Sequence, residues 1–262
     1  MKLSIYQIDA FSDKVFAGNP ACVIPLEDWL PDELLLKIAA ENAVAETAYF
    51  VQSETGIHLR WFTPDMEMDL CGHATLAAAY VLKVHLNYDC DTLIFNTLSG
   101  RVTVQCQQDR LTLDFPSRPA VPVSLPKVIQ QAFSIEPGSV LKARDYLLIY
   151  PKADDVMKLQ VNRALFDTLD LGTGGVIVTA PGDYCDFVSR FFTPQATILE
   201  DPVTGSAHCT LVPYWRQRLN KSSLLAMQLS SRGGTLYCKD QGSRVMIGGN
   251  ARTYMVGHIW ID

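Results

Sequence analysis

The feature that most constrains this sequence is an internal repeat. The pentapeptide Arg60–Pro64 recurs with one conservative change as Arg190–Pro194, 130 residues further along a chain of 262. Each copy is followed by a second landmark in which a glycine opens a run of small residues, Cys71–Ala74 or Thr204–Ala207, and the offset there is 133. Three residues are therefore inserted in the second copy. Two landmarks in the same order indicate a duplicated unit, so we expect two similar domains.

Short β-branched and aromatic runs bounded by Gly, Pro, Asn and Asp dominate the chain, which is typical of a β-rich protein. Three stretches have helical character, namely Pro31–Asn42, the Ala- and Leu-rich Gly72–Val84, and Gly205–Leu219. The pattern predicts an α+β fold. The expected strands are 2–9, 21–25, 46–52, 56–62, 92–96, 101–106, 110–115, 145–150, 175–180, 185–192, 225–230, 235–238, 243–248 and 253–260.

The proline-rich segment Phe115–Pro122 lies where a linker between the two copies belongs. We therefore expect an N-terminal domain of residues 1–118 and a C-terminal domain of residues 119–262.

Composition narrows the classes of partner. The formal charge of −6, from 22 basic and 28 acidic residues, is spread along the chain without a Lys/Arg cluster, so neither nucleic acid nor an anionic membrane is an expected partner. No apolar run approaches a membrane span, and the first residues alternate as a strand does instead of forming a signal peptide. The seven cysteines never occur as CxxC and the five histidines never as HxH or HxxxH, so we expect no metal site and a reducing cytoplasm. A small-molecule partner fits best.

The two glycines at the expected helix starts, Gly72 and Gly205, suggest an anion site. A helix N-terminus presents unpaired N–H groups and a partial positive charge, and a glycine there lets a ligand approach the backbone. Thr204 and Ser206 could instead be ordinary helix caps. Because the two starts are related by the repeat, with His73 in one and Asp201 before the other, we interpret them together as a site for a small carboxylate.

The segments Asp69–Thr75, Glu200–His208, Gly18–Pro20 and Glu46–Phe50 together resemble the PhzF family, the phenazine-biosynthesis-type isomerases. The resemblance spans nearly the whole chain. It implies a diaminopimelate-epimerase-like fold of two pseudo-symmetric domains, each a curled mixed sheet around a central helix, with the active site in the cleft between them and the last strand, 253–260, able to complete the first domain. It also implies cofactor-independent proton transfer on a small carboxylate-bearing metabolite, and commonly a homodimer.

Glu46 is the candidate acid/base. A shift of 130 places it on Val176, so the carboxylate belongs to one copy of the repeat only, and the apolar residues around Glu46 predict a buried setting. We hypothesise that Glu46 removes a proton from an activated carbon and returns it to another carbon on the same face. The resemblance assigns the acid/base role to Glu46 and gives His73, Asp201 and Ser206 roles in substrate binding and proton relay. We expect the helix dipole to keep His73 neutral.

These arguments define two groups of predicted site residues. The predicted catalytic residues are Glu46, His73 and Asp201. The predicted substrate-binding residues are Asn19, Gly72, Thr204, Gly205 and Ser206.

Two alternatives remain. An epimerase of an amino or hydroxy acid would use two opposed bases, and Cys71 stands where the first thiol belongs, before a helix start that would lower its pKa. The position related to Cys71 by the repeat is Thr204, a poor base, and Cys209 lies five residues further on, so we rank this reaction second. A catalytically inactive binding protein with the same fold is the other alternative.

Overall fold

The computed structural model describes residues 1–262, which divide into two compact units. Unit 1 contains Met1–Phe115 and Ile247–Asp262, and unit 2 contains Pro116–Met246. The first boundary lies in the proline-rich segment. The residues from Ile247 onward belong to unit 1 instead of the expected 119–262 domain, because the last strand pairs with the first.

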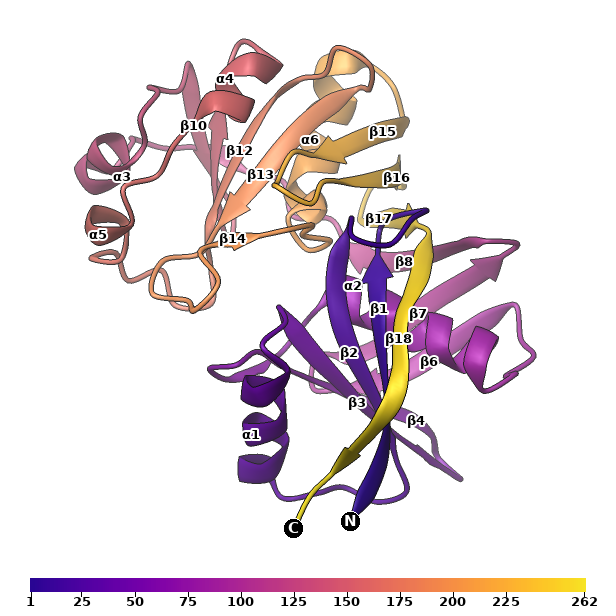
Figure 1. The fold of residues 1–262 in the computed structure, drawn as a ribbon. Coiled ribbons are helices and arrows are strands. Elements are labelled where there is room, and N and C mark those ends of the chain that lie inside the picture. Colours follow the sequence, from indigo (N-terminus) through magenta and orange to yellow (C-terminus); the bar gives the residue numbers. More distant parts are fainter. The chain divides into compact units, whose positions relative to one another are not determined.

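Unit 1 is a mixed β-sheet packed on helix α2 (Figure 1). Its strands are β1 (Lys2–Ala10), β2 (Asn19–Leu26), β3 (Glu46–Ser53), β4 (Gly56–Phe62), β5 (Glu67–Met68), β6 (Thr92–Thr97), β7 (Gly100–Gln107), β8 (Arg110–Pro116) and β18 (Ala251–Trp260). The order is β18-β1-β2-β3-β4-β6-β7-β8, in which β2/β3 and β4/β6 are parallel and the other pairs antiparallel. The short β5 pairs with the end of β4.

Two helices of unit 1 follow the sequence expectation. Helix α1 (Asp32–Asn42) begins after Pro31 and buries Leu35, Ile38 and Ala39 against the sheet. Helix α2 (Gly72–Tyr80) is buried along almost its whole length, which explains why its sequence is apolar on every face. The expected helix 72–84 changes character after Tyr80, since η1 (Val81–His85) is a π-helical turn.

Unit 2 repeats the strand order of unit 1. It contains β9 (Val121–Pro122), β10 (Ser139–Lys142), β11 (Tyr146–Ile149), β12 (Val176–Pro181), β13 (Phe187–Phe192), β14 (Glu200–Asp201), β15 (Ser223–Gln228) and β16 (Gly234–Asp240), and β17 (Arg244–Gly249) runs across the sequence boundary between the units. The pairs β10/β11, β12/β13 and β15/β16 are antiparallel, and β11/β12 and β13/β15 are parallel. The same alternation of antiparallel and parallel strand pairs runs from β1 to β7 in unit 1.

The repeated pentapeptide builds the same ion pair in both units. Arg60 on β4 makes two 2.7 Å contacts with Glu67 on β5, and Arg190 on β13 contacts Glu200 on β14 at 2.7 and 2.9 Å. Each guanidinium also lies over the phenylalanine two residues further along its strand. The three inserted residues lie in the loop between β13 and β14. In this loop the N–H of Thr193 donates to the carbonyl of Leu199, as the N–H of Thr63 donates to the carbonyl of Met66 in unit 1. The predicted α+β class with two similar units is confirmed.

The strand register corrects the expected counterpart of Glu46. Phe62 pairs with Thr47 in unit 1, and its repeat partner Phe192 pairs with Val176 in unit 2. Glu46 therefore corresponds to Gly175 and not to Val176. A Cβ at Gly175 would lie 2.5 Å from the Phe191 ring, so unit 2 has no room for any side chain there. The offset between related residues differs on the two sides of the hairpin, because the loop between β12 and β13 is longer than the loop between β3 and β4.

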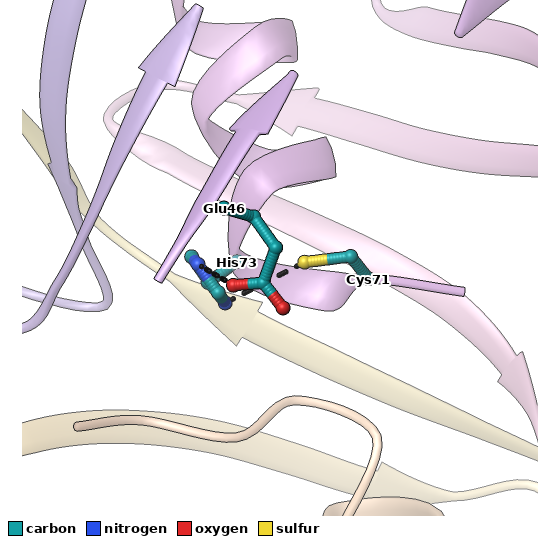
Figure 2. A group of neighbouring side chains, drawn as sticks. All are labelled: Glu46, Cys71 and His73. Carbon is teal, nitrogen blue, oxygen red and sulfur yellow. Dashed lines mark hydrogen bonds and ion pairs between the residues drawn. The ribbon is translucent and has the colours of Figure 1, made fainter. Parts of the chain in front are cut away.

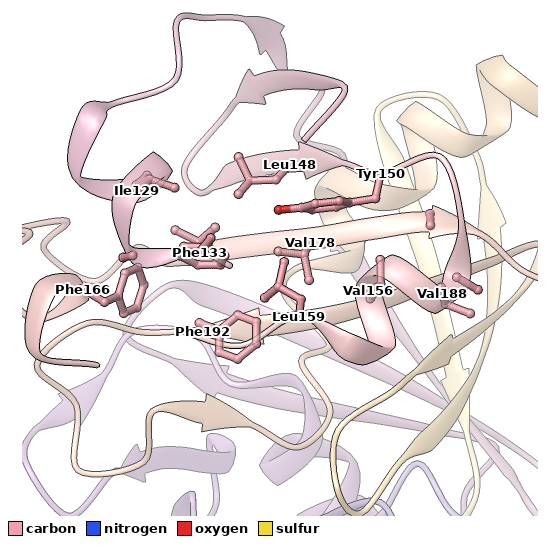
Figure 3. Close-up of a cluster of buried hydrophobic side chains, with 14 residues drawn as sticks. Ile129, Phe133, Leu148, Tyr150, Val156, Leu159, Phe166, Val178, Val188 and Phe192 are labelled. Atoms are coloured by element: carbon pink, nitrogen blue, oxygen red, sulfur yellow. The ribbon is translucent and has the colours of Figure 1, made fainter. Parts of the chain in front are cut away.

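Unit 2 also contains short helices that the sequence pattern did not indicate. They are α3 (Lys127–Ala132), α4 (Ala153–Lys158) and α5 (Arg163–Phe166), in addition to α6 (His208–Leu219). Helix α4 lies against β12 and β13, and α3 lies against α5. Figure 3 shows the apolar cluster beneath them, in which Phe133, Phe166 and Phe192 meet edge to face. No helix in the structure has both the length and the apolar character needed to cross a bilayer.

Candidate functional site

The four predicted site residues of unit 1, together with Cys71, meet where β3 begins and α2 begins. Glu46 is the first residue of β3, Cys71 precedes α2 as its N-cap, and His73 is in the first turn of that helix. Figure 2 shows the side chains of these three residues directed toward one another. Asn19, at the start of β2, contacts His73 from the other side of the ring. Gly72 lies between Cys71 and His73 at the helix start.

The central contact joins a carboxylate to an imidazole. Glu46 Oε2 lies 3.0 Å from His73 Nε2, and the side chains are 14% and 3% exposed respectively. Both atoms are fully shielded, yet they are not aligned for a hydrogen bond, so the contact is a close charge pairing in which the oxygen lies off the N–H direction. Since Oε2 is shielded, the exposed part of the Glu46 side chain belongs to its other atoms.

The neighbouring charges change the expected protonation of this cluster. Burial alone lowers the pKa of His73, but Cys71 and Glu46 outweigh it and raise the pKa of His73 well above its ordinary value. The expectation that the helix dipole alone keeps His73 neutral is therefore wrong. Burial, with Glu46 as a further cause, raises the pKa of the Cys71 thiol to about 11, so the expected lowering by the helix start is also wrong. Desolvation exceeds the dipole effect here.

The imidazole stands between its partners. Asn19 Nδ2 lies 3.0 Å from His73 Nδ1, and Cys71 Sγ lies 3.6 Å from the same nitrogen. Glu46 contacts the opposite nitrogen. Asn19 and His73 are both buried, so Asn19, which we expected among the substrate-binding residues, packs behind the histidine.

Glu46, Cys71 and His73 each carry an atom of a type that binds metal ions, and these atoms lie within 4.8 Å of one another. Zinc requires its ligand atoms at roughly 2.0–2.3 Å from a common centre. The thiol is directed to Nδ1 of the ring and the carboxylate to Nε2, whose lone pairs diverge. As the side chains are arranged, a single ion could not take all three as ligands unless the ring turned.

In unit 2, Asp201 and Thr204 form one hydrogen-bonded loop. The Thr204 hydroxyl donates to Asp201 Oδ2 at 2.5 Å. The buried amide of Gln228 holds both ends of this loop, since its Oε1 accepts from Thr204 N at 2.8 Å and its Nε2 donates to the Asp201 carbonyl at 2.8 Å. Sequence reasoning missed Gln228, which lies on β15 without a recognisable motif.

Gly205 and Ser206 lie in a turn that precedes α6, not in the helix as expected. The N–H groups of His208 and Cys209 bond three residues back, to the carbonyls of Gly205 and Ser206 at 3.0 and 3.2 Å, which is the tighter geometry of a 3₁₀ turn. The α-helix therefore begins at His208.

Ser206 has a cationic neighbour that sequence reasoning also missed. Arg144 Nη2 donates to the Ser206 hydroxyl at 3.2 Å and to Asp145 Oδ2 at 2.9 Å, and Arg144 Nε lies 3.1 Å from both oxygens of the same buried carboxylate. Asp145 Oδ1 in turn accepts from the N–H of Gly175, the counterpart of Glu46. Unit 2 thus has a carboxylate near this position, but an arginine pairs with it.

His208 is a further buried group in this region. Its Nδ1 lies 2.9 Å from the carbonyl oxygen of Thr204, whereas its Nε2 is buried without a hydrogen-bond partner. Burial lowers the pKa of His208 to about 4. The repeat offset of 133 relates His208 to Thr75, whose hydroxyl donates to the carbonyl of Cys71 in unit 1. That relation is the sequence signal that could have identified it.

Comparisons with known proteins agree on one family. A family model described as phenazine biosynthesis-like protein (PhzC-PhzF) matches residues 8–257. An uncharacterized isomerase of Pseudomonas aeruginosa is 46% identical over 260 residues, which cover 99% of each chain. The crystal structure of a PhzF-family phenazine biosynthesis protein from Enterococcus faecalis superposes with a TM-score of 0.94 at 42% identity over 100% of both chains. A hydroxyproline epimerase from Agrobacterium vitis shares the fold, with a TM-score of 0.65 at 10% identity, covering 98% of this chain and 92% of its own.

Proposed function

The chain belongs to the phenazine biosynthesis-like PhzC-PhzF family, and from that premise we propose that it is a cofactor-independent isomerase. Its reaction is the transfer of a proton between two carbons of a small carboxylate-bearing metabolite, with Glu46 as the acid/base. The observation that carries the proposal is the contact of Glu46 with His73, in which the carboxylate is the more exposed partner.

The proposed reaction uses Glu46 in both directions. The carboxylate accepts a proton from a carbon next to an unsaturated or carboxylate group, and the resulting carboxylic acid returns that proton to a different carbon. The balance is closed, because one proton leaves the substrate, one proton is returned to it from the Glu46 carboxylic acid, which can exchange with solvent between the two steps, and the double bond moves. His73 Nε2, 3.0 Å from Oε2, stabilises the carboxylate and can carry a proton to or from it.

We further propose that in unit 2 the Ser206 hydroxyl and the backbone of Gly205 can bind a carboxylate group, and that in unit 1 the backbone of Gly72 can do the same. Arg144 supports this role for Ser206, because it places a positive charge at hydrogen-bond distance from the hydroxyl. Thr204 and Asp201 keep the preceding loop in place through their mutual hydrogen bond.

Epimerisation by Cys71 has less support. A thiol acts as a base through its thiolate, and burial raises the pKa of Cys71 to about 11, so the thiolate is rare at neutral pH. The counterpart in unit 2, Thr204, already donates its hydroxyl proton to Asp201. No second thiol stands in the related position.

The test is proton exchange in deuterated water on a panel of unsaturated and α-amino carboxylates, read by mass spectrometry and NMR. Glu46→Gln should lower the exchange rate by about 10²–10⁴-fold, the usual contribution of a general acid/base. Binding of the same carboxylate, measured by calorimetry, should remain. Movement of a double bond indicates the isomerase, and label at a single inverted carbon indicates an epimerase.

Glu54→Gln is the matched control, because Glu54 is an exposed residue of the turn that follows β3. It should leave the exchange rate unchanged. If Glu46→Gln exchanges protons as fast as the Glu54→Gln protein, Glu46 is not the acid/base.

A further inference from the structure

We propose that Asn19 is a positioning residue, which holds the His73 ring in the neutral form whose proton is on Nε2, facing Glu46. This inference rests on the proposed function and assigns Asn19 a role through His73 instead of a contact with the substrate. The geometry that supports it is the approach of the Asn19 amide nitrogen to His73 Nδ1 at 3.0 Å.

The local sequence places Asn19 with little freedom. Gly18 has a φ of +68°, and a Cβ there would lie 2.2 Å from the carbonyl oxygen of Ala10, so glycine is required for this close approach. Pro20 restricts the backbone of the residue before it to extended conformations. Asn19 is then paired with Ala10 in the β1/β2 ladder, and its side chain is fully buried.

An amide nitrogen can only donate, so the ring atom that receives the Asn19 N–H must be an unprotonated nitrogen. Nδ1 is that atom, and the thiol of Cys71, 3.6 Å from it, is a second possible donor. A neutral imidazole with an unprotonated Nδ1 carries its proton on Nε2. That proton is on the side of Glu46.

The alternative form would hinder the proposed reaction. If His73 were protonated on both nitrogens, the Nδ1 proton would face the Asn19 N–H at 3.0 Å. The imidazolium would also hold Glu46 as its counter-ion and make the carboxylate a weaker base. The charge of Glu46 favours this form, and the Asn19 amide opposes it. The identity of residue 19 therefore sets the balance between a neutral ring and an imidazolium.

The experiment measures the ring directly, by ¹⁵N NMR of protein labelled at histidine, with His73 assigned by comparison with His73→Gln. In the native protein, at pH values above the raised pKa of His73, we expect Nε2 protonated and Nδ1 unprotonated. Asn19→Asp replaces the donor with an acceptor of the same shape, so both nitrogens should be protonated over that range. We expect kcat for proton exchange to fall about 10- to 100-fold with KM little changed, as when a residue that orients a site histidine is replaced.

Asn96→Asp is the matched control, because the Asn96 amide on β6 donates to the carbonyl of Thr55 instead of to His73. It should change neither the ring signals nor kcat. If a buried aspartate prevents folding, Asn19→Leu serves instead, because leucine has a similar shape but neither the amide donor nor the amide acceptor. In Asn19→Leu the His73 ring should lose its preference for a proton on Nε2.

A native ring whose neutral form carries its proton on Nδ1 would overturn the inference. So would an Asn19→Asp protein with native ring signals. The ring measurement does not depend on turnover, so it is separate from the Glu46→Gln test. Native ring signals as expected, together with full exchange in Glu46→Gln, would reject the proposed function alone.

Discussion

Acidification from pH 7 to pH 5 should destabilise unit 2 through the single imidazole of His208. The ring carries its proton on Nδ1, since that atom faces the carbonyl oxygen of Thr204 at 2.9 Å, and Nε2 is buried without a partner. A second proton on Nε2 would be a buried charge without an acceptor, at the first residue of α6 where the helix dipole also opposes it.

The magnitude follows from the two pKa values. The pKa of His208 is about 4 in the folded protein against an ordinary 6.5, because burial disfavours the charged form. Below about pH 6.5 the unfolded chain therefore binds a proton at His208 that the folded chain does not bind, so the free energy of unfolding falls as the pH falls. Linkage gives a loss of ~2 kcal/mol at pH 5 and ~3 kcal/mol at pH 4, with none above pH 7.

The assay is urea unfolding at pH 7, 6 and 5, compared between the native protein and His208→Gln. The fluorescence of Trp215, which stacks on Phe187 beside His208, reports on unit 2. Other groups titrate equally in both proteins, so the difference between their pH profiles isolates His208. His208→Thr, which introduces the residue found at the related position Thr75, is a second variant without a titrating side chain. Parallel profiles for native and substituted proteins would refute the reasoning.

Three further predictions concern packing, binding and assembly. Gly175→Ala should destabilise unit 2 by about 1–3 kcal/mol in urea unfolding, because its Cβ would lie 2.5 Å from the Phe191 ring, whereas Gly257→Ala, with open space around it, should be nearly neutral. Arg144→Gln should weaken the affinity for a carboxylate, measured by calorimetry, about 10- to 100-fold, because it removes the cation beside Ser206. An unchanged affinity would show that Arg144 does not contribute to carboxylate binding. Light scattering should give twice the chain mass of 29.1 kDa if the chain is a homodimer, as the family resemblance implies.

Much of the fold is predictable from local pattern. Every strand expected from the alternating runs is present within a few residues, and the helix at 31–42 is present almost as expected. Helices α3, α4 and α5 have only four to six residues each, too few to show a helical period. The repeat in Arg60–Pro64 and Arg190–Pro194 predicted two similar units, and the arginine of each copy forms an ion pair with a glutamate of the following strand.

The candidate site was predicted less completely. Its residues in unit 1 came from motifs and from the family resemblance, since no spacing rule relates Glu46 on a strand to His73 on a helix. Arg144 and Gln228 were missed because each acts through a contact distant in sequence. His208 was missed because its relation to Thr75 appears only when the repeat is extended to this position. The offset of 130 failed at Gly175 because pairing across the hairpin, not position in the chain, sets which residues correspond.

By itself the sequence determined the strands, the helix at 31–42 and the duplication, because these depend on neighbouring residues and on short repeated patterns. The tertiary structure alone decided which ring nitrogen of His73 faces Glu46, that Cys71 is a buried thiol with a raised pKa, and that His208 is held neutral. Protonation depends on the removal of water and on charges brought within a few ångströms, and only packing brings residues so distant in the chain together.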